Sequence, residues 1–320
     1  MRLVVILASA AALAIAAGAG ARSNVSALPL GIAGDPARFQ DQTGQRSAIQ
    51  HAFLGWGQGV TWGRRIVPLL QGLGPIPMIH LGIGNARRKP VISPRDIANG
   101  RGDAYLVGLN AGIAEYGGLV YVRPMAEMNN PNTFYSPVTK SGRSRGPAYS
   151  AAAYRAAFCR IFVILHGGTR AMINAALRAC SLPPLGARED LPANPKSRLK
   201  VIWNPLAGLG GWKDFYPGDR WVDLVGNDMY GSGGDFSRPQ NEELYAFARA
   251  HHKRYSLPEW GVSVDQPEFV RYICDFIKSR TKIVLAAYYD SKAGSPWDLA
   301  NKPNSKQTYR ACITPLGANA

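Results

Sequence analysis

The chain has 320 residues, of which 46% are hydrophobic and 18% charged, and its 37 Lys and Arg against 21 Asp and Glu give a formal net charge of +16. A normal hydrophobic fraction with few charges excludes an intrinsically disordered chain. A protein that crosses a membrane several times is also excluded, because the one long apolar run lies at the extreme N-terminus. The length suits one large domain or two small ones, with enough chain to bury a core.

The first 21 residues have the three parts of a secretion signal. Arg2 supplies positive charge, residues 3–17 are apolar, and residues 19–21 are small, as a cleavage site requires. We predict that residues 1–21 are a signal peptide and that residues 22–320 form the secreted chain, extracellular or periplasmic. An uncleaved membrane anchor is the alternative, but the run is short and weakly apolar for a span, so we expect no stable membrane insertion.

Four cysteines in an exported protein predict two disulfides. Cys159 and Cys180 flank the helix breaker at residues 167–168, and Cys274 and Cys312 lie near the C-terminus. Pairing each cysteine with its nearer neighbour is one of three possible connectivities. No Cys-x-x-Cys spacing occurs, so a zinc or redox site has little support.

The positive charge allows several interpretations. A nucleic-acid partner is disfavoured by the predicted secretion and by arginines that are scattered rather than clustered with aromatic residues. An anionic polymer of the cell envelope or an acidic polysaccharide fits a secreted basic protein. A basic, solvated surface without a specific partner explains the charge equally well.

Short apolar runs, each followed by turn residues and then a helical pattern, recur eight times along the chain. Strands that alternate with helices are expected to be parallel and joined by right-handed crossovers. Eight such units favour an α/β fold, a closed (β/α)8 TIM barrel in a single domain, over an open doubly wound sheet. The predicted strands are Leu28–Ala33, Ala52–Gly55, Ile76–Leu81, Leu119–Ala126, Lys200–Asn204, Val222–Asp228, Tyr255–Glu259 and Ile283–Tyr288. The predicted helices are Trp62–Leu73, Pro94–Tyr116, Tyr149–Leu165, Thr169–Ala179, Asn241–His252 and Pro267–Ser279.

Motifs of other α/β proteins are missing from this chain. Residues 30–34, after the first predicted strand, lack the spacing of a phosphate-binding glycine loop, and no Gly-x-Ser-x-Gly turn of a serine hydrolase occurs. The longest interval between strands, from the fourth to the fifth, contains a basic loop with Lys140, Arg143 and Arg145. We interpret this interval as an insertion and not as a second domain.

Two glutamates follow strand ends, where the active site of a (β/α)8 barrel lies. Glu127 follows the fourth predicted strand and Glu259 ends the seventh. A retaining glycoside hydrolase needs such a pair, about 5–5.5 Å apart, in which one carboxylic acid protonates the leaving oxygen and the other attacks the anomeric carbon. A structural salt bridge is the alternative for any single glutamate, but both lie in aromatic, turn-rich segments, which favours catalysis.

Other polar and aromatic residues lie at the same strand ends. Aromatic rings suit substrate contact because the C–H bonds of a sugar face pack on a ring. His80 could contact substrate in a subsite, or it could be a barrel histidine whose hydrogen bonds are made within the protein. The sequence favours neither interpretation. The remaining candidates for substrate contact are Trp56, Asn129, Trp203, Tyr230, Trp260 and Trp297, with Asp228 as a supporting group.

Two sequence segments carry a resemblance to a known family. Residues 99–105 (NGRGDAY) open a helix that leads into residues 118–124 (GLVYVRP), and residues 216–219 (YPGD) are followed by residues 222–230 (VDLVGNDMY). These segments resemble the helix before the Arg-Pro-x-His-Glu-Met-Asn strand and the YPGD…VDxxGxDxY segment of glycoside hydrolase family 26, the β-mannanase family of clan A. The resemblance covers roughly residues 28–289.

The resemblance implies roles for individual residues. Glu127 would be the general acid/base and Glu259 the nucleophile. Tyr230 would donate a hydrogen bond that favours the ionised nucleophile, Arg123 would lie beneath the acid/base and orient the site, and Trp203 would be a sugar platform.

One position departs from the family pattern. The residue before the acid/base is usually a histidine that touches the sugar, whereas this chain has Ala126. We therefore expect either a compensating contact or a substrate other than mannan. The basic loop at residues 140–145 is one place where a different, acidic glycan could be recognised.

We predict a secreted, monomeric, endo-acting hydrolase that cleaves a β-linked polysaccharide with retention and uses no metal or organic cofactor. One alternative is a non-catalytic barrel that binds a glycan or the cell envelope. Ala126 and the positive charge support that alternative, whereas the presence of both glutamates favours the enzyme. Another alternative is an inverting hydrolase, whose carboxyl groups would lie farther apart, at roughly 6.5–9.5 Å.

Overall fold

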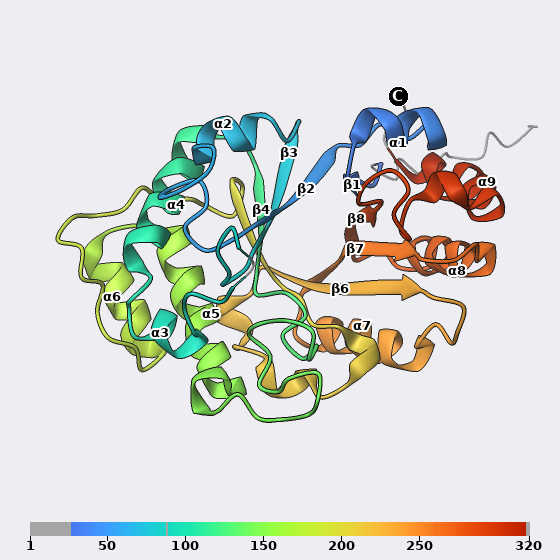
Figure 1. Ribbon diagram of the computed structural model, residues 1–320. Helices are drawn as coiled ribbons and strands as arrows, with labels where there is room; N and C mark the ends of the chain where they lie inside the picture. Colours follow the sequence, from blue (N-terminus) through green and yellow to red (C-terminus); the bar gives the residue numbers. More distant parts are fainter. Residues whose placement is uncertain (1–26, 88, 318–320) are drawn as a thin grey trace, which may run out of the picture.

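The computed structural model describes residues 27–87 and 89–317 (Figure 1). The predicted signal peptide at residues 1–21 lies outside these residues. Eight parallel strands pair in sequence order and close into a barrel, which confirms the predicted (β/α)8 fold. The strands are β1 (Leu30–Ala33), β2 (Ile49–Leu54), β3 (Ile76–Leu81), β4 (Val120–Pro124), β5 (Leu199–Trp203), β6 (Leu224–Gly231), β7 (Arg254–Val262) and β8 (Ile283–Tyr289).

Helices surround the barrel, with α2 to α6 on one side and α1, α8 and α9 on the other (Figure 1). None of the helices in the described part of the chain is long and apolar enough to cross a membrane. The helices are α1 (Pro36–Thr43), α2 (Ile66–Gln71), α3 (Pro94–Ala98), α4 (Asp103–Tyr116), α5 (Ala151–His166), α6 (Arg170–Ala179), α7 (Arg238–Ala250), α8 (Pro267–Lys278) and α9 (Pro303–Cys312).

One predicted helix is divided in the structure, and two helices were not predicted. The single helix predicted at residues 94–116 is divided into α3 and α4, because Gly100 between them has a φ of +89°, which no α-helix accommodates. The sequence did not predict α1 or α9. In α9 only Ser305 and Tyr309 are buried, so this helix lacks the apolar periodicity on which helix prediction relies.

Along β3 and β4 the barrel interior changes from apolar to polar. Met78 and Tyr121 belong to a buried cluster inside the barrel, near the beginnings of β3 and β4. Two residues farther along the same strands are His80 and Arg123, which share the inward orientation because side chains alternate with a period of two. Polar groups thus collect at the carboxyl ends of the strands, which is where the candidate site lies.

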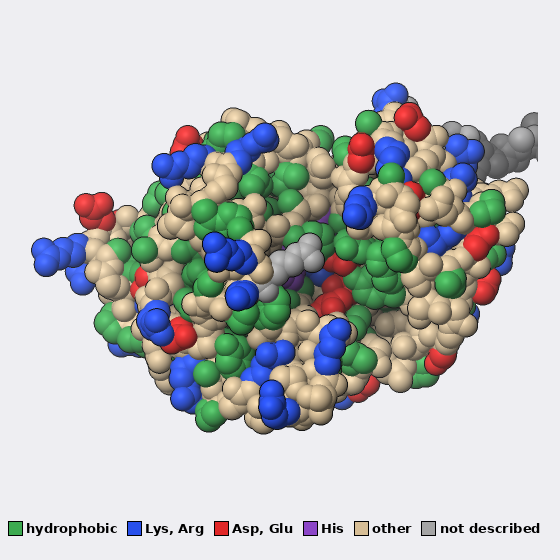
Figure 2. Space-filling view, viewed as in Figure 1, with side chains coloured by type: hydrophobic (Ala, Val, Ile, Leu, Met, Phe, Trp, Pro, Cys, Tyr) green, Lys and Arg blue, Asp and Glu red, His purple; other side chains and the backbone are tan. Residues whose placement is uncertain are grey.

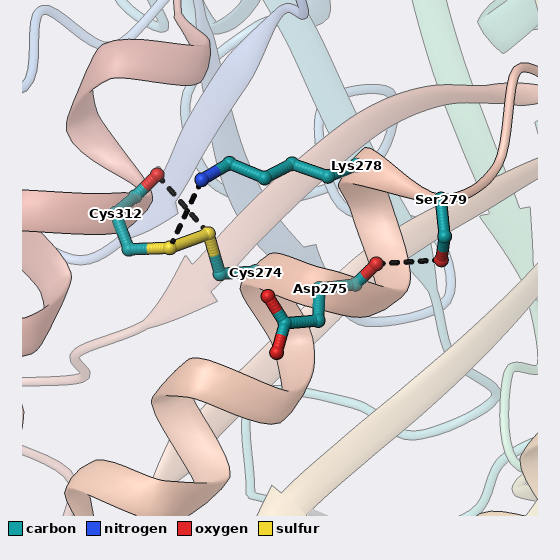
Figure 3. The surroundings of a disulfide bond; sticks show 5 residues. All are labelled: Cys274, Asp275, Lys278, Ser279 and Cys312. Carbon is teal, nitrogen blue, oxygen red and sulfur yellow. Dashed lines mark hydrogen bonds between the residues drawn. A yellow bond between two sulfur atoms is a disulfide. The ribbon is translucent and has the colours of Figure 1, made fainter.

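Two disulfides tie together helices of the outer layer, and they confirm the predicted number of bonds. Cys159 on α5 is bonded to Cys180, directly after α6. Cys274 on α8 is bonded to Cys312 at the end of α9 (Figure 3). The connectivity is therefore the one that joins neighbouring cysteines, since each pair belongs to helices that follow one another along the chain.

Candidate active site

A pocket of about 350 Å³ opens at the carboxyl ends of the strands. Figure 2 shows a hollow near the middle of this face, with acidic and histidine side chains on its floor. The pocket contains both predicted glutamates, so the barrel brings together residues that lie far apart in the sequence. Its lining consists of Phe53, His80, Arg123, Ala126, Glu127, Thr133, Tyr135, Asp228, Tyr230, Glu259, Tyr289 and Trp297.

Glu259, within β7, is held by two hydrogen-bond donors. Arg123 Nη1 donates to Glu259 Oε2 at 2.9 Å, and the Tyr230 hydroxyl donates to Glu259 Oε1. The side chain is nearly buried, so these contacts also fix its direction. A cationic and a neutral donor on the two oxygens suit a carboxylate that is kept ready for nucleophilic attack.

Glu127 lies in a tight turn directly after β4. Its φ is +57°, a left-handed conformation that costs a non-glycine residue free energy and is stabilised here by a 2.6 Å hydrogen bond from its own N–H to the Asn204 carbonyl. Asn130 Nδ2 donates to Glu127 Oε2 at 2.7 Å. Desolvation, followed by the negative charge of Glu259, raises the pKa of Glu127. The protonated form that a general acid needs is therefore favoured.

Arg123 on β4 is completely buried and connects several groups at the floor of the pocket. Besides Glu259, it reaches Asp228 Oδ2 at 2.5 Å through Nη2 and Asn204 Oδ1 at 3.1 Å through Nε. Desolvation nevertheless raises the pKa of Asp228 well above its usual range, and the neighbouring glutamates add to this effect. One guanidinium thus positions two carboxyl groups from β6 and β7.

The wall around Ala126 contains the predicted candidate His80 and also Tyr135, which was not predicted from the sequence. The Tyr135 hydroxyl donates to the Ala126 carbonyl and lies 3.4 Å from His80 Nε2. Desolvation and the charge of Arg123 lower the pKa of His80 to about 3, so this imidazole is neutral. The space left by the missing histidine is therefore bordered by a phenol and a neutral imidazole, both able to contact a sugar hydroxyl.

Two predicted substrate contacts are wrong because their rings are buried outside the pocket. Trp203 is 0% exposed and packs against Trp212 and other rings at the helical layer. Trp260 is 1% exposed and stacks on Tyr309 of α9. Each lies next to an inward-facing residue of its strand, and alternation along a strand turns its own side chain outward.

Two further predicted contacts are also displaced from the pocket. The ring of Trp56 packs edge-on against Tyr105 on α4 and lines no part of the pocket. The amide group of Asn129 donates to the carbonyls of Leu206 and Gly210, each at 2.8 Å, and accepts from the Leu206 N–H. Asn129 therefore holds the loop after β5, and its neighbour Asn130 is the residue that contacts Glu127.

Other aromatic rings do line the pocket, and Trp297 is the predicted tryptophan among them. Trp297, in the loop after β8, lies with its ring centroid 5.0 Å from that of Tyr230. Phe53 at the end of β2 is 48% exposed and was not predicted, although its inward register could have indicated it. Within residues 27–87 and 89–317, no group of three His, Cys, Asp or Glu residues is arranged to hold a metal ion.

No protein-family model matches the chain, but it is similar in sequence to a known protein. The chain is 23% identical over 287 residues to Endoglucanase H of Acetivibrio thermocellus, an alignment that covers 86% of this chain and 28% of that protein. The chain thus spans less than a third of the curated relative that it matches.

Two solved structures show the likeness of fold. The Bacillus subtilis mannanase BCman superposes with a TM-score of 0.56 at 18% identity, covering 89% of this chain and 85% of that one. A ruminal endo-beta-1,4-mannanase of glycoside hydrolase family 26 superposes with a TM-score of 0.57 at 14% identity, covering 90% of this chain and 63% of that one. The chain has the (β/α)8 fold of these enzymes and resembles family 26 of clan A along most of its length.

Proposed function

We propose that this protein is a retaining glycoside hydrolase that cleaves a β-linked polysaccharide, with Glu127 as general acid/base and Glu259 as nucleophile. The observation that carries the proposal is the unequal environment of two glutamates in one pocket. Glu259 accepts from a guanidinium and a phenol, whereas the pKa of Glu127 is raised. Two carboxyl groups in such different environments can supply one acid and one nucleophile at the same pH.

The proposed reaction has two displacements. Glu259 attacks the anomeric carbon while Glu127 transfers its proton to the leaving sugar oxygen, so the glycosidic bond breaks as a glycosyl ester forms. The ionised Glu127 then takes a proton from water, and the resulting hydroxide displaces the Glu259 carboxylate. The anomeric configuration is inverted twice and therefore retained, and Glu127 ends protonated as it began.

An endo mode and a polymeric substrate are supported by the shape of the site and by the similar proteins. A second cavity of about 550 Å³ shares Phe53, His80, Thr133 and Tyr135 with the pocket, so the hollow extends beyond the room needed by a single sugar. The similar proteins are an endoglucanase and an endo-beta-1,4-mannanase by name. We infer a β-glycan substrate, with Tyr135 and His80 taking over contacts that the family's histidine makes.

We further infer that the protein is secreted as a monomer after removal of residues 1–21. Two disulfides support an oxidising compartment, because such bonds are rare in reducing cytosol.

The decisive experiment is hydrolysis of mannans, xylans, glucans and uronic-acid polymers by the wild type, Glu259→Gln, Glu127→Gln and the exposed control Glu268→Gln. We expect new reducing ends from the wild type and the control, and a loss of at least about a thousandfold in Glu259→Gln. NMR of the first product should show the β-anomer. An α-anomer would identify an inverting hydrolase, and binding of a polymer without hydrolysis would favour the non-catalytic alternative.

A further inference from the structure

Trp297 connects the loop after β8 to the candidate nucleophile. Its partly exposed ring lines the active-site pocket and packs against Tyr230 and Tyr289, with centroid distances of 5.0 and 5.8 Å. Tyr230 in turn donates its hydroxyl hydrogen bond to Glu259. The position of this loop, residues 290–302, therefore sets one wall of the pocket and supports the residue that orients the nucleophile.

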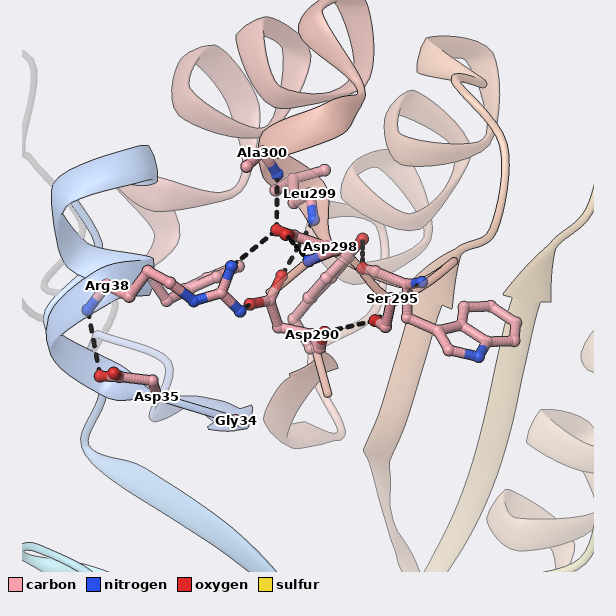
Figure 4. A network of polar contacts seen from close by, with 12 residues as sticks. Gly34, Asp35, Arg38, Asp290, Ser295, Asp298, Leu299 and Ala300 are labelled. Carbon is pink, nitrogen blue, oxygen red and sulfur yellow. Dashed lines mark hydrogen bonds and ion pairs between the residues drawn. The ribbon is translucent and has the colours of Figure 1, made fainter. Parts of the chain in front are cut away.

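Two buried aspartates give the loop its shape (Figure 4). Asp290 Oδ1 accepts from the Leu299 N–H at 2.9 Å. The two oxygens of Asp298 accept from the N–H groups of Ala300 at 3.0 Å and Gly294 at 2.7 Å. Apart from one short 3-10 turn, the loop has no regular structure of its own, so these carboxyl groups take the place of a hydrogen-bond ladder.

Arg38 on α1 bridges both aspartates from a distant part of the sequence. Its Nη1 lies 2.7 Å from Asp298 Oδ1, and its Nη2 pairs with Asp290 Oδ2. The Asp290 side chain is 0% exposed and that of Asp298 is 4% exposed. Among the described residues, Arg38 makes the only ion pairs with either aspartate. Two buried carboxylates in one loop require such a counter-charge.

We propose that Arg38 is a positioning residue of the active site, which holds loop 290–302 so that Trp297 packs on Tyr230 and forms the sugar-facing wall. Arg38 lines neither cavity, so its effect must pass through the loop. This inference rests on the proposed hydrolase function. Arg38 is suited to the task because its planar guanidinium offers separate nitrogens to the two carboxylates, a fixed geometry that the single nitrogen of a lysine ammonium does not provide.

A double-mutant cycle tests the proposal with Arg38→Met, Trp297→Ala and the combined variant. We expect Arg38→Met to lower kcat/KM on the polysaccharide roughly ten- to hundredfold, because a small displacement of a positioning wall is costly. In the Trp297→Ala background the same substitution should cause no further loss, since the group that Arg38 positions is already gone. Arg38→Lys, which keeps the charge, should lie between the wild type and Arg38→Met.

The matched control is Arg160→Lys, which weakens a comparably buried ion pair between α5 and Asp103 of α4, remote from both cavities. We expect it to lower Tm but not kcat/KM when activity is measured well below its Tm. The proposal is overturned if Arg38→Met under the same condition keeps the wild-type kcat/KM. It is equally overturned if the loss is as large in the Trp297→Ala background.

A spectroscopic readout separates this proposal from the proposed function. In protein containing 5-fluorotryptophan, the Trp297 resonance, assigned by its loss in Trp297→Phe, should shift or broaden in Arg38→Lys. The resonances of Trp203 and Trp260 should stay in place. A wild type without hydrolytic activity refutes the hydrolase, whereas an unchanged Trp297 resonance refutes the role of Arg38. Arg38→Lys also serves if Arg38→Met does not fold.

Discussion

The two candidate glutamates differ in the groups that reach their carboxyl oxygens. Glu259 accepts from Arg123 and Tyr230, whereas Glu127 accepts from the neutral amide of Asn130. Charge-assisted donation stabilises a carboxylate more than donation from a neutral amide does. The placement of one guanidinium thus distinguishes the two proposed roles.

The environment of Glu127 predicts the alkaline limb of the pH profile. Desolvation and the charge of Glu259 raise the pKa of Glu127, and the hydrogen bond from Asn130 opposes them. Asn130→Ala should therefore raise this pKa further. Because a general acid works only while protonated, the limb of kcat/KM that falls with rising pH should move to higher pH.

This shift is measured with kcat/KM between pH 4 and 10. Asn174→Ala, on α6 and away from both cavities, is the control and should leave the limb in place. A limb that does not move in Asn130→Ala would contradict the assignment of Glu127 as the acid.

At the scale of elements, the end of α5 depends on the predicted helix breaker. Gly167 has a φ of +65°, and a Cβ atom added there would lie 2.0 Å from the Pro192 carbonyl oxygen. The connector between α6 and β5 thus passes so close to the helix end that only glycine fits. At Gly168, with a φ of +116°, the nearest side-chain atom would be 4.0 Å away.

We therefore expect Gly167→Ala to lower the free energy of unfolding by roughly 2–4 kcal/mol, through backbone strain together with a clash. Gly168→Ala is the matched control, since it carries strain without the clash and should cost less. Urea denaturation of both variants gives the comparison. Equal losses would show that the close approach of Pro192 is unimportant.

The disulfides offer a second prediction about elements. The bonded cysteines are separated by 38 residues in the α8–α9 pair and by 21 in the α5–α6 pair. From the entropy of loop closure, removing the first bond by Cys274→Ser with Cys312→Ser should cost about 4 kcal/mol, and removing the second about 3 kcal/mol. Chemical denaturation measures both. Losses below about 1 kcal/mol would mean that the unfolded chain is already constrained.

For the molecule as a whole, charge and pH set the conditions for stability. The formal charge is +16, and Lys and Arg side chains are spread over the face seen in Figure 2 rather than gathered in one patch. Such a chain repels itself increasingly as carboxylates become protonated. Carboxylates with a lowered pKa stay ionised to lower pH, so they keep their ion pairs longest and oppose this repulsion.

Asp223 is one such group. Desolvation would raise its pKa, but hydrogen bonds from His166, the Val201 N–H and Lys196 outweigh it, so the pKa is lowered. A depressed pKa contributes stability above the unfolded value of about 3.9, and this contribution is lost as the pH falls through the folded value. We expect the free energy of unfolding to fall below about pH 4, and less steeply in Asp223→Asn.

Urea denaturation between pH 2.5 and 6 measures these slopes. Asp41→Asn, at an exposed position of α1, is the control and should leave the slope unchanged. If Asp223→Asn has the wild-type slope, the acid sensitivity must arise at other carboxylates.

The local pattern of apolar and polar residues in the sequence determined much of the fold of this protein. The alternation of apolar runs with helical segments predicted eight strands and the closed barrel, because both periodicities depend on residues a few positions apart. It also placed Glu127 and Glu259 at the strand ends that meet in one pocket. Within strands, however, a shift of one residue reverses the side chain, which is why Trp203 and Trp260 were assigned to the wrong face.

Contacts between distant segments were decided only by the tertiary structure. Arg123 and Glu259 are 136 residues apart, and Arg38 and Asp290 are 252 apart. Such pairs leave no local periodicity, since barrel closure and loop conformation bring them together. The same reason explains why Trp297 and not Trp203 lines the pocket. The order of the strands follows from local pattern, whereas the partners of each active-site group follow from packing.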